Sequence, residues 1–293
     1  MRLLCTIILF LTETLLSAQL PSTQLYHFKL SQSNGIYRLS QPRWLNKFNP
    51  DGYNNQPFFF SEEEIYISAR LPQDTSQTDI YALNLHSNIL TRITATPESE
   101  YSPKPIPGSA DFSVVRVDAT KEKIQRLWKY PLNRTNGGRQ IFNKMEGVGY
   151  YHWITTAKAI LFIVKEPKNE LYLVDSIENK VQKLNHVPGR CFAYTSSGKV
   201  VFTEKTANLE SPVHILDPET LEDKIAMKTL PGSEDFVVAE DGTFFMGNNS
   251  DFYKYNPKSD KKWVLIANLR DYGIKKIERL ALNKSGDLVM VCR

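Results

Sequence analysis

The sequence predicts an all-β fold, a six-bladed β-propeller in which every blade is a four-stranded antiparallel sheet. Three observations predict it: a repeat of short apolar strands, turn signals between those strands, and N-terminal strands that complete the last repeat. The repeat is marked by a nearly continuous apolar strand every 40 to 48 residues, starting at residues 65, 112, 160, 200, 244 and 288. Several short strands in a unit of this length are typical of a propeller blade.

These apolar strands are expected to be the second strands of their blades. A third strand, in which apolar residues alternate with others, follows each of the first five and covers residues 80–83, 127–130, 171–174, 213–216 and 252–255. β-Branched and aromatic residues dominate both kinds of strand, and the absence of a helical pattern excludes helical repeats of similar length. Hairpin turns are indicated by Ser197-Gly198, Asp241-Gly242 and Ser285-Gly286.

The two ends of the chain are expected to share the last blade. The sixth apolar strand, residues 288–291, is followed only by Cys292 and Arg293, so this blade lacks its outer strands. The missing pattern is found in residues 25–30 and 36–39. We therefore expect the N-terminus to supply the third and fourth strands of the last blade, which would leave no free sheet edge.

The remaining strands can be placed from the same pattern. The first complete blade is expected at residues 56–60, 65–69, 78–83 and 90–94. The innermost strands of the later blades are expected to begin near Ser102, Tyr150, Cys191, Asp235 and Glu278. No linker or low-complexity stretch divides these strands, so residues 19–293 are predicted to form one domain, and we expect a monomer.

Residues 1–18 have the layout of a secretory signal peptide. Arg2 precedes the apolar run 3–11, and the small residues Ser17 and Ala18 follow it. The run is shorter than the ~20 residues of a membrane-spanning helix, and no later segment is apolar enough to span a membrane. We expect cleavage near Ala18 and a secreted or periplasmic protein.

Charge and cysteine content exclude two further classes. The net charge of +4 is spread along the chain, whereas nucleic-acid binding favours clustered basic residues. After residue 18 only Cys191 and Cys292 remain, too few for a disulfide scaffold, and both are expected to be buried thiols.

The first blade resembles the repeat of the TolB-type, WD-like six-bladed propellers. The resemblance lies in residues 56–61 (QPFFFS), 65–68 (IYIS), 78–84 (TDIYALN) and 90–94 (LTRIT). The family's Pro-Asp-Gly turn is replaced here by three glutamates, and the later blades keep only the strand pattern. The resemblance implies an exported bacterial propeller that works by binding. TolB carries an extra α/β domain for which this chain has no room, so the envelope role of TolB is not implied.

The candidate site is the mouth of the central channel, where the innermost strands begin. Every blade places polar, charged or tyrosine side chains there: Asn54, Glu100, Tyr101, Tyr151, His152, Arg190, Glu234, Asp235 and Arg279. Mixed charge with exposed tyrosines suits a polar ligand, a sugar or a peptide segment. The alternative is that these residues only solvate the rim and pair with one another.

His152 has two interpretations. It is either a hydrogen-bonding or general-base group at the channel, or a structural histidine beside Trp153 in the core between blades, and the second is favoured. The other histidines, His27, His86, His186 and His214, fall in different repeats without metal-ligand spacing, so no metal site is predicted. The Gly-x-Ser-x-Gly and Ser-x-Asp-x-Gly motifs are absent, and no catalytic residue is assigned.

The sequence thus favours a non-catalytic binding module without a cofactor, which engages a protein partner or a polar small ligand at the channel mouth. The alternative is a propeller hydrolase acting on lactones or esters, with Ca²⁺ held by oxygens of Asn54, Glu100, Glu234 and Asp235. Arg190 and Arg279 disfavour it, because both would bring positive charge into the same space.

Overall fold

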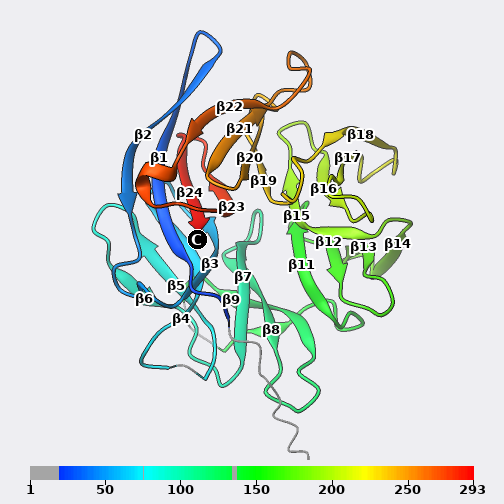
Figure 1. Ribbon diagram of the computed structural model, residues 1–293. Helices are drawn as coiled ribbons and strands as arrows, with labels where there is room; N and C mark the ends of the chain where they lie inside the picture. Colours follow the sequence, from blue (N-terminus) through cyan, green and yellow to red (C-terminus); the bar gives the residue numbers. More distant parts are fainter. Residues whose placement is uncertain (1–19, 75, 134–136) are drawn as a thin grey trace, which may run out of the picture.

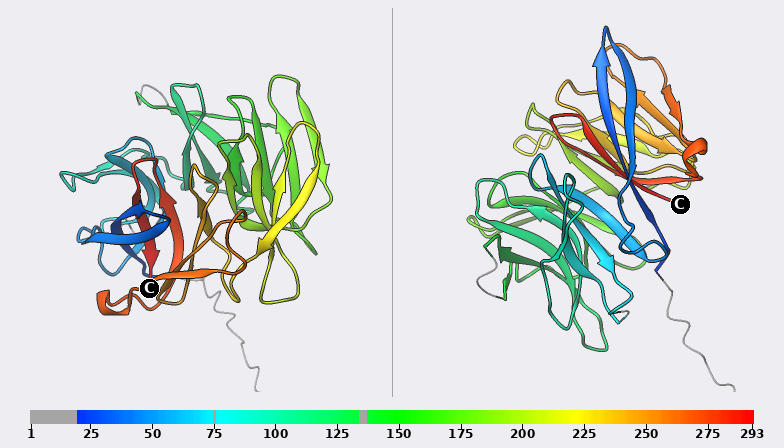
Figure 2. Two further views of the ribbon diagram at one scale, coloured as in Figure 1. Left: turned by 90° about the horizontal axis from the view of Figure 1, so that it is seen from above. Right: turned by 90° about the vertical axis from the view of Figure 1, so that its left-hand side faces the viewer.

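The computed structural model describes residues 20–74, 76–133 and 137–293 and consists of six four-stranded antiparallel sheets arranged around a central axis (Figures 1 and 2). This confirms the predicted six-bladed propeller. The expected signal peptide, residues 1–18, lies outside the described residues. Within the described ranges there is no helix with the length and apolar character needed to cross a bilayer.

Blades 1 to 3 follow one another along the chain, each built from four consecutive strands. Blade 1 consists of β3 (Tyr53–Phe59), β4 (Glu64–Arg70), β5 (Asp79–Asn84) and β6 (Leu90–Arg92). Blade 2 consists of β7 (Ser99–Pro105), β8 (Asp111–Val117), β9 (Gln125–Pro131) and β10 (Arg139–Gln140). Blade 3 consists of β11 (Val148–Trp153), β12 (Lys158–Ile163), β13 (Glu170–Asp175) and β14 (Lys180–Leu184).

Blades 4 to 6 complete the ring. Blade 4 consists of β15 (Pro188–Tyr194), β16 (Val200–Glu204), β17 (Pro212–Leu216) and β18 (Asp223–Lys228). Blade 5 consists of β19 (Phe236–Val238), β20 (Phe244–Asn248), β21 (Asp251–Tyr255) and β22 (Val264–Asn268), and a 3-10 helix, η1 (Arg270–Tyr272), follows it. Blade 6 consists of β23 (Ile277–Leu282), β24 (Asp287–Cys292), β1 (Gln24–Ser33) and β2 (Ile36–Trp44).

Blade 6 joins the two ends of the chain as predicted. Strand β1 lies between β24 and β2, with Tyr26 opposite Met290 and Phe28 opposite Leu288. The blue N-terminal strands lie beside the red C-terminal strand in all three views (Figures 1 and 2). The side chains of Phe28, Leu288 and Met290 are buried in one cluster, so the contact is held by apolar packing as well as by the strand ladder.

The core lies between neighbouring blades, because side chains point alternately to the two faces of each strand. In β16, Phe202 packs against blade 3, whereas its neighbour Val201 packs against blade 5. Both side chains are fully buried. The near-continuous apolar pattern of the second strands follows from this burial on both faces.

Turns and cysteines also agree with expectation. The hairpin glycines Gly198, Gly242 and Gly286 have φ values of 77°, 84° and 84°, which glycine adopts without steric cost. Cys191 and Cys292 are free and buried. The innermost strands of blades 2 to 6 begin within three residues of their predicted starts.

Candidate functional site in the central channel

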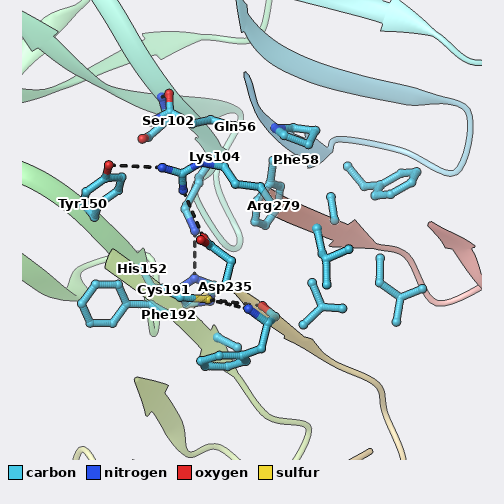
Figure 3. Close-up of a pocket in the computed structure, with 18 of the residues that line it drawn as sticks. Gln56, Phe58, Ser102, Lys104, Tyr150, His152, Cys191, Phe192, Asp235 and Arg279 are labelled. Atoms are coloured by element: carbon cyan, nitrogen blue, oxygen red, sulfur yellow. Dashed lines mark hydrogen bonds and ion pairs between the residues drawn. The ribbon is translucent and has the colours of Figure 1, made fainter. Parts of the chain in front are cut away.

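The innermost strands of all six blades, β3, β7, β11, β15, β19 and β23, line a cavity of about 430 Å³ along the axis (Figure 3). Aromatic side chains form part of its wall, among them Phe58, Tyr150, Phe192 and Tyr194. Four cationic side chains line the cavity but only one acidic side chain, and these are Lys104, Arg190, Arg279, Lys284 and Asp235. The cavity therefore combines an apolar wall with an excess of positive charge.

Three of these charges contact one another: Arg190 on β15, Asp235 directly before β19, and Arg279 on β23. Arg190 donates from Nε to Asp235 Oδ2 at 2.8 Å, and Arg279 donates from Nη1 to Asp235 Oδ1 at 3.3 Å. Arg279 also donates to the Tyr150 hydroxyl at 3.2 Å, and its guanidinium lies over that ring. Burial is the largest single influence and lowers the pKa of both arginines, but Asp235, Tyr150 and other nearby groups together raise it above its ordinary value, so both stay charged. We call these three residues the Asp235 triad.

A different arrangement is found on β7 and β11. The Lys104 ammonium lies 3.1 Å from Nδ1 of His152 and 5.0 Å from the centroid of the Phe58 ring. No carboxylate of the described residues forms an ion pair with it, since Asp235, the one acid in the cavity lining, is held by two arginines. The side chains that contact the Lys104 ammonium are thus uncharged, and the Arg279 guanidinium lies nearby (Figure 3).

The pKa values of Lys104 and His152 reflect these surroundings. Burial lowers the pKa of the Lys104 ammonium to about 8, and Arg279 contributes to the lowering. Burial, together with the positive charge of Lys104, holds the pKa of His152 well below its usual range. The imidazole is therefore neutral at pH 7, and its Nδ1 can accept a hydrogen bond from Lys104.

Six of the predicted site residues lie at or near this cavity. His152, Arg190, Asp235 and Arg279 line it, and Glu234 lines a neighbouring pocket, where it accepts a hydrogen bond from the Arg190 backbone N–H at 2.7 Å. The sixth, Tyr151, also lines the cavity, but the expectation that it is exposed is wrong. Its side chain is 1% exposed, because the hydroxyl donates to the Ser102 carbonyl at 2.8 Å.

The other three, Asn54, Glu100 and Tyr101, do not line the cavity. Asn54 is fully buried, and its amide donates to the Thr23 carbonyl at 3.0 Å, which holds the segment before β1 against blade 1. Glu100 is fully buried beside Thr94, and this burial raises the pKa of its carboxyl group to about 7. The Tyr101 hydroxyl accepts a hydrogen bond from Thr78. These contacts connect parts of the fold to one another.

The structure agrees in part with each interpretation of His152, as a structural residue and as a polar group at the channel. Trp153 packs in the core between blades 2 and 3, as the structural interpretation expects. The ring of His152 itself, however, faces the channel and contacts Lys104 and Tyr194.

Sequence reasoning missed Lys104, Gln56 and Tyr150, which also line the cavity. For Gln56 and Lys104 the reason lies in two β-bulges: Gln56 in β3 and Ser102 in β7 have φ values of 53° and 55°, and the strand register shifts at both. A bulge inserts one residue and reverses the side-chain alternation beyond it. Lys104, two residues after the bulge at Ser102, therefore could not be assigned to a face from alternation alone.

The calcium-site arrangement expected for a hydrolase is not formed. Asn54 and Glu100 are hydrogen-bonded away from the channel cavity, and Asp235 is bonded to two arginines. The proposed oxygen ligands therefore do not converge on one point, and the nearest positive charges would repel a divalent cation.

Comparison with known proteins supports the fold. A TolB-like protein from Agrobacterium tumefaciens matches with a TM-score of 0.67 and 8% identity, over 92% of this chain and 98% of that one. A chain of the nidogen/laminin complex matches with a TM-score of 0.63 and 10% identity, over 88% of this chain and 97% of that one. A gluconolactonase-like protein matches with a TM-score of 0.55 and 10% identity, over 82% of this chain and 88% of that one.

No protein-family model matches the sequence, and no curated protein is significantly similar to it. At these identities the likeness shows the fold alone, and the fold is shared by binding modules and by hydrolases. The chain is a six-bladed β-propeller similar in structure to TolB.

Proposed function

We propose that this protein is a non-catalytic binding module that engages a protein partner or a polar ligand at its channel mouth, and that the group received there is a carboxylate. The observation that carries the proposal is the Lys104 ammonium, enclosed in a cavity with net positive charge and without an acidic partner. An enclosed charge that no opposite charge neutralises is costly to maintain. A ligand carboxylate would supply the missing partner.

The expected energy of this contact is substantial. A hydrogen bond between two charged groups contributes about 1.5–3 kcal/mol, more than a neutral one. The side chain of His152 lies beside the ammonium and, as a neutral group, does not compete for the ligand's charge. The Asp235 triad is already paired internally, so it shapes the channel without requiring a ligand.

The size and wall of the cavity limit what can enter. A volume of about 430 Å³ lies in the range of small-molecule sites and is too small for a folded domain. Phe58 and Phe192 offer apolar surface to the rest of the ligand. A protein partner would therefore insert a side chain or a short segment ending in a carboxylate. A chain of the same fold occurs in the complex of nidogen with laminin, which supports protein binding as a use of this fold.

Two further expectations belong to the proposal. The pattern of residues 1–18 supports export to the periplasm or the medium. The hydrolase alternative receives no support from the channel, because the oxygen ligands that it requires are bonded elsewhere.

Isothermal titration with two probes tests the proposal. The probes are an N-acetylated hexaglutamate amide, which represents an acidic peptide, and citrate, which represents a small carboxylate. Wild-type protein should bind at least one of them at 1:1 stoichiometry, and an N-acetylated hexaglutamine amide should not bind. The probe that binds indicates whether the natural ligand is a peptide or a small acid.

The variant Lys104→Met locates the site. It keeps the length of the side chain and removes the charge, and we expect it to weaken binding about 100-fold, corresponding to about 2.7 kcal/mol. The matched control is Lys168→Met, which removes an exposed lysine remote from the channel cavity and should leave binding unchanged. Equal binding by wild type and Lys104→Met, or no binding of either probe to wild type, would overturn the proposal.

A further inference from the structure

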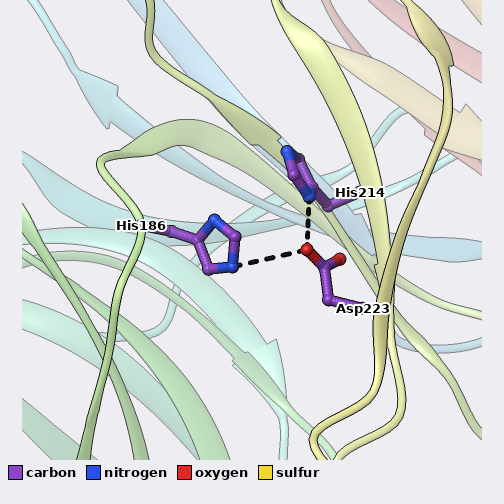
Figure 4. A group of neighbouring side chains, drawn as sticks. All are labelled: His186, His214 and Asp223. Carbon is purple, nitrogen blue, oxygen red and sulfur yellow. Dashed lines mark hydrogen bonds and ion pairs between the residues drawn. The ribbon is translucent and has the colours of Figure 1, made fainter.

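Two histidines and an aspartate from blade 4 and the segment that leads into it meet outside the channel (Figure 4). His186 lies in the segment between β14 and β15, His214 lies in β17, and Asp223 begins β18. One nitrogen of each ring and one oxygen of Asp223 all lie within 4.8 Å of one another. We call these three residues the His186 cluster. It is the only such group of three potential ligands among the described residues.

Packing against Phe202 explains why the cluster forms. In the ladder between β16 and β17, His214 is directly opposite Phe202, and the two rings stack with centroids 5.1 Å apart. Phe202 belongs to the apolar cluster shared with blade 3. His186 packs edge-on against the Phe202 ring at 5.1 Å and against the His214 ring at 4.8 Å. The histidines thus come together on the face of blade 4 that meets blade 3.

Glu204 orients both rings. One of its oxygens lies 3.2 Å from Nδ1 of His186, and the other lies 3.1 Å from Nε2 of His214. If each of these nitrogens donates its proton to Glu204, the other nitrogen of each neutral ring carries a lone pair. Those other nitrogens are Nε2 of His186 and Nδ1 of His214.

Both lone pairs then face the same carboxylate oxygen. Asp223 Oδ2 lies 2.8 Å from Nδ1 of His214 and 3.5 Å from Nε2 of His186. Two imidazole lone pairs and a carboxylate oxygen would repel one another unless a cation lies between them. Metal-binding histidines generally donate their second nitrogen to a carboxylate, which is the role that Glu204 has here.

We propose that the His186 cluster binds a Zn²⁺ ion, with Glu204 holding both imidazoles from behind. Zn²⁺ binds imidazole nitrogen and carboxylate oxygen at about 2.0–2.2 Å, so tetrahedral ligand atoms lie about 3.4 Å apart. Two of the three separations, 2.8 and 3.5 Å, lie on either side of that value, and the two histidine nitrogens lie within 4.8 Å of each other. A set of two imidazoles and one carboxylate selects Zn²⁺ over Ca²⁺ or Mg²⁺, which prefer oxygen ligands alone.

The bound ion would have an open coordination position, and it would also stabilise the local structure. Three protein ligands leave the fourth position to water, and the side chains of His186 and Asp223 are 19% and 23% exposed, so solvent can reach the ion. The ion would link the segment before β15 to strands β17 and β18. That segment leads directly to Arg190, so the metal would also hold one end of the channel wall in place.

Titration of the EDTA-treated protein with ZnCl₂ tests this proposal, and it does not depend on the channel ligand. We expect one Zn²⁺ per chain by calorimetry and a rise in melting temperature on adding Zn²⁺. Co²⁺ used as a spectroscopic probe should give the intense visible absorption of a four-coordinate ion. A competing arrangement has both imidazoles protonated and paired with the carboxylates, and it predicts no Zn²⁺ binding at all.

Variants assign the ligands. His186→Gln and Asp223→Asn should each weaken Zn²⁺ binding at least about 100-fold, whereas Glu204→Gln should weaken it about 10-fold to 100-fold. His86→Gln removes an exposed histidine outside the cluster and serves as the control, which should bind as wild type does. His186 lies in a connecting segment, so its replacement should leave the fold intact, and circular dichroism would verify this. Undetectable binding by wild type, or unchanged binding by His186→Gln and Asp223→Asn, would overturn the proposal.

Discussion

Two sets of charges share the channel, and they differ in how they are neutralised. In the Asp235 triad, one carboxylate bonds to two arginines, and the Tyr150 hydroxyl accepts a further hydrogen bond. On β7 and β11, Lys104 contacts a neutral imidazole and aromatic rings, with no acid of the described residues beside it. A charge whose partners are all internal supports the fold, whereas a charge without such a partner is available to a ligand. The comparison therefore distinguishes the Asp235 triad, which stabilises the fold, from Lys104, which can bind a ligand.

The largest expected effect is on stability, and it should fall on the Asp235 triad alone. Asp235→Asn leaves Arg279 without an acidic partner and leaves Arg190 with only Glu234, 4.0 Å away. Because Arg190 is partly exposed, we expect a loss of about 2 kcal/mol in the free energy of unfolding, less than for a fully buried pair. Lys104→Met should raise that free energy, because it removes an enclosed charge and no ion pair is lost. Urea denaturation measures both variants, and equal losses would contradict the distinction.

A smaller effect is expected from pH, and it should fall on Lys104 alone. The lowered pKa of about 8 means that the ammonium is charged at pH 7 and loses its proton as the pH rises through 8. Glutamate carboxylates stay ionised throughout this range. Hexaglutamate binding should therefore be constant below about pH 7 and fall by up to about tenfold from pH 8 to pH 9.

The lowered pKa of Lys104 also predicts that the stability of the ligand-free protein changes with pH in the opposite direction to ligand binding. The unfolded lysine keeps its proton to a higher pH than the folded one, so the folded state is penalised below about pH 8 and the penalty disappears as the pH rises above it. Ligand binding should thus weaken over the pH range in which the ligand-free fold becomes more stable. For Lys104→Met, neither ligand binding nor stability should change in this way with pH. If the residual binding of this variant fell between pH 8 and pH 9 as wild-type binding does, the titrating group would not be Lys104.

Much of the fold could be predicted from the sequence because it rests on local patterns. The spacing of the apolar strands and the turn glycines fixed the number of blades, and the strand pattern of residues 25–30 revealed the closure that the ladder between β1 and β24 confirms. These features depend on side-chain type and alternation alone, and tertiary contacts reinforce them.

The candidate site could be predicted only in part, because it depends on contacts between blades. Arg190, Asp235 and Arg279 follow from their positions near the starts of inner strands. Lys104 was missed because the bulge at Ser102 alters which side chains face the channel. The His186 cluster was missed for another reason: the β17–β18 hairpin brings His214 and Asp223 together, but His186 comes from the segment before β15 and joins them only by packing against Phe202 and His214.

The most direct test of the central claim is the pKa of Lys104 itself, measured by NMR titration of the lysine side chains with and without the bound acidic probe. A carboxylate placed next to the ammonium stabilises its charged form and raises its pKa. We predict a pKa of about 8 in the free protein and a clear rise when hexaglutamate or citrate is bound. A Lys104 pKa that the bound probe leaves unchanged would show that the anion binds elsewhere, and the account of the channel would be wrong.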